Sequence, residues 1–422
     1  MVSSIVAPSS PPDEPADKAA AALVSRLPTL PLELQHQVIL ESFDPTPTYS
    51  SLPTRYAVLH RYSLVSKTWH ALVEPLLYRD LAFSDPERAK LFLASLEARG
   101  KDDPRPARVR TLRVGHVHWL GSTFAQMEAD QLRAAEEDRP SVVRLPAADF
   151  GLDELVRRCD KLQDLWVAGL ERVLLPTLCH AQELRGLHIL RCGIINSDSE
   201  TDEVPSVLPT LPRLEILECY ADFDDESFDT VFSSVTAPSM RHLAFACLHD
   251  EFPPRIDPSK VTCLSTIGDF PPSFSAAPLL LLDLYQSPLR TSLPHLPRSI
   301  LILRLNDLSP TLASVPWLLV DHHTSDALAR ALPRLRELWL PHSYIEWRDD
   351  PKRSVRDMVA AWVGQWKRRG VRVVFEEDED EDNRRRDPDD QVLTEAAAFD
   401  FPFARLAQRV EQMALEEREA AG

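Results

Sequence analysis

The sequence predicts an α/β solenoid preceded by a short unit of three helices. Two observations predict the solenoid: an apolar pattern recurs in order from residue 109 to residue 340, and stretches between its copies carry apolar residues at helical spacing. One observation predicts the helical unit: residues 30–78 lack that pattern and contain three short apolar-periodic stretches instead. The 422 residues suffice for one large domain or two ordinary ones.

Each copy of the pattern reads apolar, two residues, apolar, one residue, apolar. Its middle alternates apolar and polar residues, as a strand with one buried face does. One strand and one helix cannot enclose a core, but stacked copies can. An ordinary α/β domain would show similar alternation, and the ordered copies without a glycine-rich fingerprint favour the solenoid. Clear copies begin at Val109, Leu162, Leu184, Leu214, Met240, Leu279, Ile300 and Leu335, with a weaker one at Val261.

The N-terminal helical unit follows from proline positions and apolar spacing. Pro31 suits the first turn of a helix that ends before the prolines at 45 and 47. A second stretch is centred near Leu59. The third, residues 69–77, carries apolar side chains at i, i+3, i+4, i+7 and i+8, and Pro75 inside it predicts a kink or a restart. Three short helices bury little surface alone, so this unit is expected to lean on something else.

Three blocks of this unit resemble an F-box: Leu30-Pro31-x-Glu33-Leu34, Leu64-Val65-Ser66-Lys67-x-Trp69 and Leu76-Leu77-Tyr78. In that family the motif is a helical peg that docks on the adaptor subunit of a cullin-based (SCF) ubiquitin ligase. The link over residues 44–54 is longer than the family's usual one. The resemblance implies an adaptor-binding set of Leu30, Pro31, Leu34, Val38, Ile39, Leu64, Val65 and Trp69.

The repeats carry a second resemblance. Leu184-x-x-Leu187-x-Ile189-x-x-Cys192-x-Ile194 resembles the leucine-rich repeat, and the other copies resemble degenerate forms of it. Together the two resemblances suggest an F-box protein with degenerate leucine-rich repeats, of the fungal type of that family. The expected segments are a disordered start (1–26), the F-box (27–82), a connecting helix and linker (83–108), the solenoid (109–375), an acidic linker (376–390) and a C-terminal helix (391–422).

Composition excludes several functional classes. The net charge of −18 argues against a general nucleic-acid binder and against docking on an anionic membrane. No apolar run is long enough to span a bilayer, and the first ten residues lack a secretory signal pattern. Six cysteines stand singly, without a CxxC pair, which indicates small buried side chains in a reducing compartment, cytoplasm or nucleus.

No enzyme motif is visible in the sequence. A phosphate-binding glycine loop, a G-x-S-x-G nucleophile motif and an H-E-x-x-H zinc motif are all missing. The pairs His116/His118 and His322/His323 have no cysteine or carboxylate nearby at ligand spacing, so ordinary histidines are favoured over a metal site. We therefore expect no catalysis, no metal and no cofactor on this chain.

Two functional hypotheses remain. In the first, the chain is a substrate receptor of an SCF-type ligase, with the peg on the adaptor, and through it a cullin, and the solenoid on a client protein. In the second, it is a repeat scaffold outside any ligase, and the peg caps the solenoid. Exposure of Leu34, Val38 and Trp69 distinguishes them, because an open apolar face marks a partner site.

The client site is expected on the strand face opposite the apolar pattern. Two tryptophans there suit a binding hot spot, and acidic neighbours suit a client that is basic as well as apolar. The alternative is that an insertion or the C-terminal helix covers one or both rings as ordinary core. Whether that helix docks on the solenoid or waits for a partner stays open. The candidate client-binding residues are Trp166, His188, Glu218 and Trp339.

Overall fold

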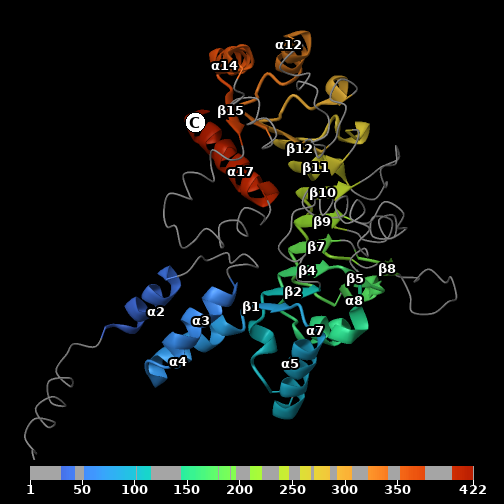
Figure 1. The fold of residues 1–422 in the computed structure, drawn as a ribbon. Helices are drawn as coiled ribbons and strands as arrows, with labels where there is room; N and C mark the ends of the chain where they lie inside the picture. Colours follow the sequence, from blue (N-terminus) through green and yellow to red (C-terminus); the bar gives the residue numbers. More distant parts are fainter. Residues whose placement is uncertain are drawn as a thin grey trace, which may run out of the picture.

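The protein is an α/β fold built on one large parallel sheet, seen in a computed structural model (Figure 1). Its strands follow one another in space in the order in which they occur in the chain. The structure describes residues 30–42, 52–100, 102–115, 144–178, 180–190, 192–195, 210–220, 237–246, 257–267, 270–285, 292–306, 322–340, 352–375 and 402–421.

The large sheet has eleven strands in the described residues, and every neighbouring pair is parallel. Every copy of the apolar pattern, including the weak one at Val261, lies at one of these strands. The strands are β1 (Asp80–Phe83), β2 (Thr111–Gly115), β4 (Asp164–Ala168), β7 (Gly186–Leu190), β9 (Ile216–Tyr220), β10 (His242–Ala246), β11 (Cys263–Ile267), β12 (Leu281–Tyr285), β13 (Ile302–Asn306), β14 (Glu337–Leu340) and β15 (Arg372–Phe375).

A row of aligned leucines, which we call the leucine ladder, runs across ten strands on one face of the sheet. Each member pairs in register with a member on the next strand, and all are buried. They belong to a single apolar cluster with the helices that cover this face, so the ladder is the centre of the main core. The members are Leu81, Leu112, Leu165, Leu187, Leu217, Leu243, Leu264, Leu282, Leu303 and Leu338.

We call the ladder side the outer face, and helices contribute side chains to its core. These helices are α5 (Pro86–Arg99), α7 (Leu152–Arg158), α8 (Leu175–Leu178), α12 (His322–Ala331) and α14 (Arg353–Arg368). Short 3₁₀ turns connect other strands at Pro106–Arg108, Ala147–Phe150, Pro258–Lys260, Pro272–Phe274 and Leu293–His295. Two small parallel pairs, β3 (Leu145–Pro146) with β5 (Leu170–Glu171) and β6 (Val173–Leu174) with β8 (Ile194–Ile195), flank the main sheet.

The last helix–strand unit lies at the end of the outer core. A stripe of apolar residues at helical spacing from Val355 to Trp366, ending at Gly370, predicts its helix, and residues 371–375 predict its strand. Trp362 and Trp366 of α14 are buried, with ring centroids 6.1 Å apart in an edge-to-face arrangement. Gly370 follows α14 with φ of 79°, a left-handed conformation that glycine adopts without steric cost. The chain then enters β15, which pairs with β14.

The N-terminal helical unit consists of α2 (Leu32–Glu41), α3 (Leu52–Ser63) and α4 (Lys67–Leu77). It has a small core of its own, separate from the sheet core, made by Ile39, Leu59, Val73 and Leu76. The Ser66 hydroxyl caps α4 by accepting the Trp69 amide at 3.1 Å. The expected kink is not a restart, because α4 continues through Pro75 to Leu77.

Polar contacts join the helical unit to the first strand. Arg55 of α3 lies 3.0 Å from the Asp80 carboxylate, and both side chains are nearly fully buried. The Tyr56 hydroxyl donates to the Asp80 carbonyl, and burial raises the pKa of Tyr56 to about 12. Arg108, just before β2, pairs with Glu74 of α4 at 3.1 Å. The unit is therefore fixed to the sheet by groups other than its adaptor-type residues.

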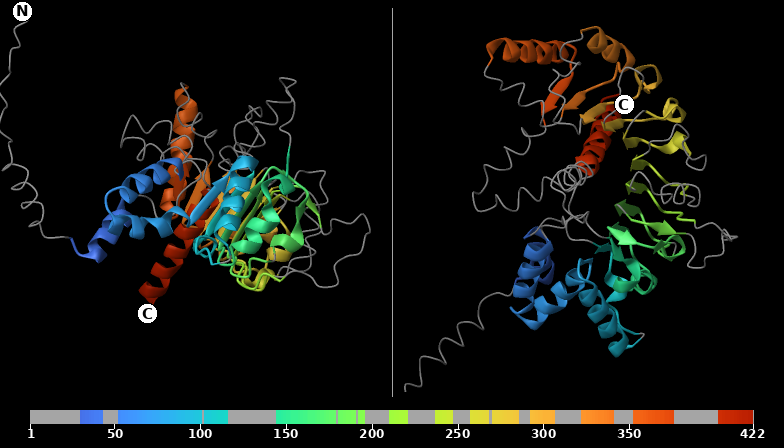
Figure 2. Two further views of the ribbon diagram at one scale, coloured as in Figure 1. Left: turned by 90° about the horizontal axis from the view of Figure 1, so that it is seen from below. Right: turned by 45° about the vertical axis from the view of Figure 1, so that its right-hand side comes forward.

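The C-terminal helix α17 (Pro402–Ala421) packs on the opposite face, which we call the inner face. Figures 1 and 2 show α17 and the helical unit on one side of the sheet, and α5 and α7 on the other. Leu406, Ala407 and Val410 are buried there, so the question left open by the sequence is answered: this helix docks on the sheet.

The start of the sheet differs from expectation, and two further expected segments fall on residues that the structure does not describe. The sheet begins at Asp80, inside the segment expected to be helical, because Tyr78-x-x-Leu81-x-Phe83 has the spacing of the pattern and its strand pairs with β2. The charged stretch 125–138, whose composition favours a helix, and the acidic linker 376–390 lie outside the described residues.

Candidate functional site

The helical unit presents a concentrated set of exposed apolar side chains. Seven of the nine large apolar side chains exposed in the described residues lie between Leu30 and Val65. Leu34 and Val38 on α2 are 46% and 45% exposed, and Leu64 and Val65 before α4 are 74% and 61% exposed. Exposed apolar side chains gathered on a small unit are typical of surfaces that a partner covers, because water-exposed apolar area favours burial.

Two of the eight expected adaptor contacts are placed differently. Ile39 is fully buried in the helical core. Trp69 is half-buried and packs edge-to-face on Tyr62, with centroids 5.2 Å apart. Ile39 and Trp69 thus pack inside the helical unit. The other six expected residues are exposed: Leu30, Pro31, Leu34, Val38, Leu64 and Val65.

Three of the four expected client-binding residues lie side by side on the inner face. Trp166 on β4, His188 on β7 and Glu218 on β9 are aligned in register. The Trp166 ring stacks on His188 at 3.7 Å and 10°, and Nδ1 of His188 donates to the Glu218 carboxylate at 2.6 Å. The Arg113 guanidinium, on β2, lies over the same indole at 5.5 Å. A client could therefore reach only the edge of the Trp166 ring, because neighbours occupy both sides of it.

A glycine makes room for this cluster. A Cβ on Gly186 would stand 2.4 Å from Oδ1 of Asp164 and 3.0 Å from Nε2 of His188. The missing side chain thus lets the Asp164 carboxylate lie beside the imidazole. Burial raises the pKa of Asp164, and the charges of His188 and Arg113 partly oppose this.

The fourth expected residue, Trp339, is far along the sheet and buried beneath α17. It is 7% exposed, its indole N–H donates to Glu337 at 2.9 Å, and Arg409 of α17 lies over the ring at 5.7 Å. Trp339 is therefore not open to a client while α17 is docked. The sequence signal for this cover is the helical spacing of Leu406, Val410 and Met413.

Between these two regions the inner face buries an ion pair that the sequence interpretation missed. Asp283 on β12 and Arg304 on β13 are aligned in register and 3.0 Å apart, and both are buried. Ser265 on β11 donates to the same carboxylate oxygen at 3.2 Å. The signal was present as polar residues at the same position of three successive copies.

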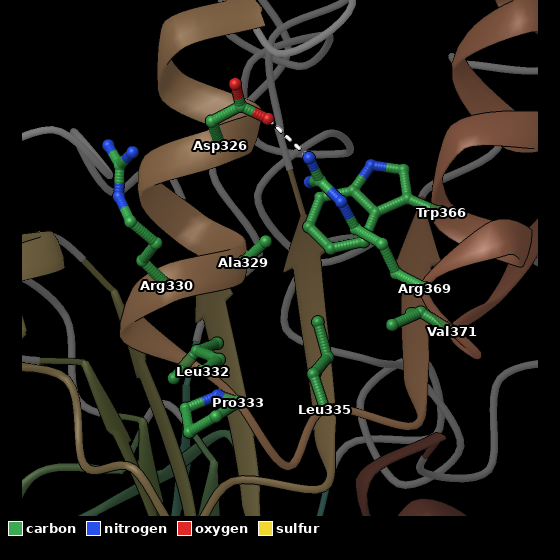
Figure 3. Close-up of a pocket in the computed structure, with 9 residues that line it drawn as sticks. All are labelled: Asp326, Ala329, Arg330, Leu332, Pro333, Leu335, Trp366, Arg369 and Val371. Atoms are coloured by element: carbon green, nitrogen blue, oxygen red, sulfur yellow. Dashed lines mark hydrogen bonds and ion pairs between the residues drawn. The ribbon is translucent and has the colours of Figure 1, made fainter.

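A cavity of about 410 Å³ lies between α12 and α14 at the end of the sheet. Figure 3 shows the residues that line it. Its walls include the apolar side chains of Leu332 and Leu335, while an ion pair between Asp326 and Arg369 crosses the space between the helices. The buried indole N–H of Trp366, also in its lining, has no hydrogen-bond partner in the described structure. None of the adaptor-binding or client-binding residues expected from the sequence lines this cavity.

The cysteines whose placement is described are buried. Burial raises the pKa of Cys159, Cys192 and Cys263 to about 12, which suppresses the reactive thiolate. In the described part of the chain no group of three or more His, Cys, Asp or Glu side chains is arranged for a metal ion. His116, His118 and the side chains of His322 and His323 lie outside the described structure. None of the described helices combines the length and the apolarity needed to cross a membrane.

Comparison with known families found no family model that matches this chain, and comparison with curated proteins found no matching protein. The functional proposal below rests on the residues and geometry of the chain itself.

Proposed function

We propose that this chain is a substrate-receptor subunit of an SCF-type ubiquitin ligase. In this proposal the helical unit is the F-box that docks on the adaptor, and through it on a cullin. The large parallel sheet is a solenoid of degenerate leucine-rich repeats that holds a client. No bond is made or broken on the chain, and it accelerates ubiquitin transfer by holding client lysines near the charged carrier.

One observation carries this proposal: the apolar patch on the helical unit is open although the unit is fixed to the sheet. Its own core uses Ile39, Leu59 and Val73, and its anchor uses Arg55 and Glu74. Leu34, Val38, Leu64 and Val65 take part in neither and stay exposed. A unit that served only as a cap would have turned its largest apolar side chains toward the sheet.

The ordered parallel strands support the receptor half of the proposal. Repeats that stack one strand at a time produce an extended face, which is a common protein-binding architecture. The unbroken register of the leucine ladder fits such stacking. An adaptor and a cullin place the protein in the cytoplasm or the nucleus, and no cofactor is needed.

The test is co-purification of the adaptor with the full chain. Replacing Leu34 and Val38 together by Lys should abolish adaptor capture, because a charge placed in a desolvated apolar interface loses its hydration without a partner. The matched control replaces Leu91 and Leu415, two leucines exposed outside the helical unit, by Lys. Equal adaptor recovery from both double variants would contradict the proposal.

A second candidate, a scaffold outside any ligase, is favoured by the anchor to the first strand. The buried Arg55–Asp80 pair and the Tyr56 hydrogen bond show that α3 contacts the edge of the sheet as a cap would. Under this alternative the folded wild-type chain captures no adaptor. The same experiment therefore separates the two functions.

A further inference from the structure

The inner face beneath α17 is built to receive an amphipathic helix. Leu406, Ala407 and Val410 are buried, and Met413 and Ala414 pack beside them, which gives apolar contacts at i, i+1, i+4, i+7 and i+8. The receiving side chains come from six strands of the sheet, β10 to β15, and form one cluster with the helix. They are Ala244, Cys263, Leu281, Ile302, Trp339 and Val374.

Charged pairs fix how the helix lies on this face. Arg409 donates to the buried Glu337 carboxylate at 2.6 Å, and Glu411 accepts from His242 at 3.2 Å. Glu417, nearer the C-terminal end of the helix, pairs with Arg334 and Arg336. The contacts therefore specify a basic residue three positions after the first apolar contact, and acidic residues farther along.

The Glu337 carboxylate identifies what any occupant of this face must supply. It is 3% exposed, and it accepts from Trp339 at 2.9 Å as well as from Arg409. Removing Arg409 would leave a buried carboxylate with less compensating charge, which is costly. Arg372, at 3.5 Å, offsets only part of that loss. A replacement helix must therefore bring its own cation to this point.

The attachment of α17 is also separable from the rest of the fold. In the described structure its packing and ion-pair contacts are side-chain contacts to the finished sheet, and the leucine ladder lies on the other face. Residues 376–401 stand between β15 and α17 in the sequence, so chain connectivity permits α17 to leave without removing a strand.

We propose that this part of the inner face is a helix-binding site that α17 occupies in the free chain, and that the partner is a client helix that displaces it. The client helix carries the α17 pattern: apolar residues at i, i+1, i+4 and i+7, an Arg or Lys at i+3, and an acidic residue at i+5. The assignment of the partner helix to a ligase client rests on the proposed function, but the helix-binding site does not.

The experiment uses the full chain and a fluorescent peptide with the sequence of residues 402–421. The tethered α17 competes with this peptide at an effective concentration of about a millimolar, so the wild-type chain should bind it weakly. Val410→Asp in the chain should weaken its own helix and raise the affinity for the peptide at least about tenfold. Gln408→Asp, on the exposed side of α17, is the matched control and should behave as wild type. A peptide carrying Arg409→Glu should bind neither variant.

A second variant covers the case in which Val410→Asp unfolds the chain. A protease site placed within residues 376–401 leaves the inner face unaltered, and cleavage leaves α17 held only by its contacts. Excess labelled peptide should then exchange with the cleaved helix and co-elute with the folded chain. Retention of the cleaved helix without exchange would overturn the proposal, because α17 would then be permanent core.

Adaptor capture, measured on the same proteins, separates this inference from the proposed function. Peptide exchange without adaptor capture contradicts the ligase role and retains the helix site. Adaptor capture without peptide exchange contradicts the helix site and retains the ligase role.

Discussion

The outer and inner faces of the sheet are both buried over much of their area, but they bury different chemistry. On β12 the two meet in consecutive residues: Leu282 belongs to the leucine ladder, Asp283 to the inner face, and both are fully buried. The ladder repeats one side-chain type from strand to strand. At the inner face the side chains differ from strand to strand, and polar pairs such as His188–Glu218 and Asp283–Arg304 are each matched to a particular neighbour.

This difference indicates two roles within one sheet. Apolar burial on the outer face is comparatively tolerant, since apolar swaps that conserve volume usually cost less than about 1.5 kcal/mol. Each inner charge needs its partner, because an unpaired buried charge is strongly destabilising. A one-residue slip of a strand would move its leucine to the polar face and its charge into the apolar core. We infer that the inner charges help to fix the register that the uniform ladder leaves less defined.

The largest expected effect comes from removing one partner of the inner ion pair. Asp283→Ala leaves the Arg304 guanidinium buried with less compensating charge, and should lower the free energy of unfolding by about 3–5 kcal/mol. Leu282→Ala, at the adjacent position, should cost about 2–5 kcal/mol through lost burial and a cavity. Chemical denaturation of both variants measures the comparison. A neutral Asp283→Ala would show that the pair is solvated.

Replacing both partners of the Asp283–Arg304 ion pair should not lower the stability of the fold, whereas replacing two neighbouring leucines of the ladder should lower it. Asp283→Leu with Arg304→Met removes the buried charges together, and its stability should equal that of the wild type or exceed it by about 1–4 kcal/mol. The ladder control, Leu282→Ala with Leu303→Ala, should be less stable than either single variant. A large loss in the first double variant would show that the pair stabilises the fold by more than mutual compensation.

The outer face could be predicted from the sequence because its physics is periodic. Leucine at the fourth position of each copy is enough to locate nine of the strands, and the stripe ending at Gly370 locates α14. The strand β1 was missed because its copy of the pattern, Tyr78-x-x-Leu81-x-Phe83, directly follows the apolar stripe of the third helix and falls within the F-box segment. Its pairing is visible only once β2 is beside it.

The inner face could be predicted only in part. The sequence places Trp166, His188 and Glu218 on one face, but not the stacking that occupies both sides of the indole. It also does not show that α17, far along the chain, covers Trp339. Both facts depend on contacts between distant residues: spacing along the chain indicates that residues 402–421 form an amphipathic helix, but not which surface that helix covers.

A smaller effect is expected where Gly186 makes room on the inner face. Gly186→Ala places a Cβ 2.4 Å from Oδ1 of Asp164, so it should lower the free energy of unfolding by about 1 kcal/mol. In an Asp164→Ala background the same change should cost less, since only the 3.0 Å approach to Nε2 of His188 remains and alanine reduces the entropy of the unfolded chain. A double-mutant cycle by chemical denaturation gives the coupling. Equal effects in both backgrounds would mean that Asp164 does not depend on this space.

The smallest expected effect is the pH dependence of the contact between α17 and the sheet. Burial lowers the pKa of His242, although the charges of Glu411 and Glu218 oppose this shift and Glu411 also accepts its hydrogen bond. Because the folded pKa lies below the unfolded one, the unfolded chain takes up the proton first as the pH falls. The contribution of His242 to stability is therefore full above a pH of about 6.5 and is lost progressively below it.

His242→Gln keeps a donor for Glu411 and does not titrate, so its melting temperature should fall less between pH 7 and pH 5 than that of the wild type. His70→Gln, at an exposed position of α4, is the control and should follow the wild-type curve. If the His242→Gln curve also follows the wild type, burial under α17 does not control this histidine, and the inner face is wetter than its packing indicates.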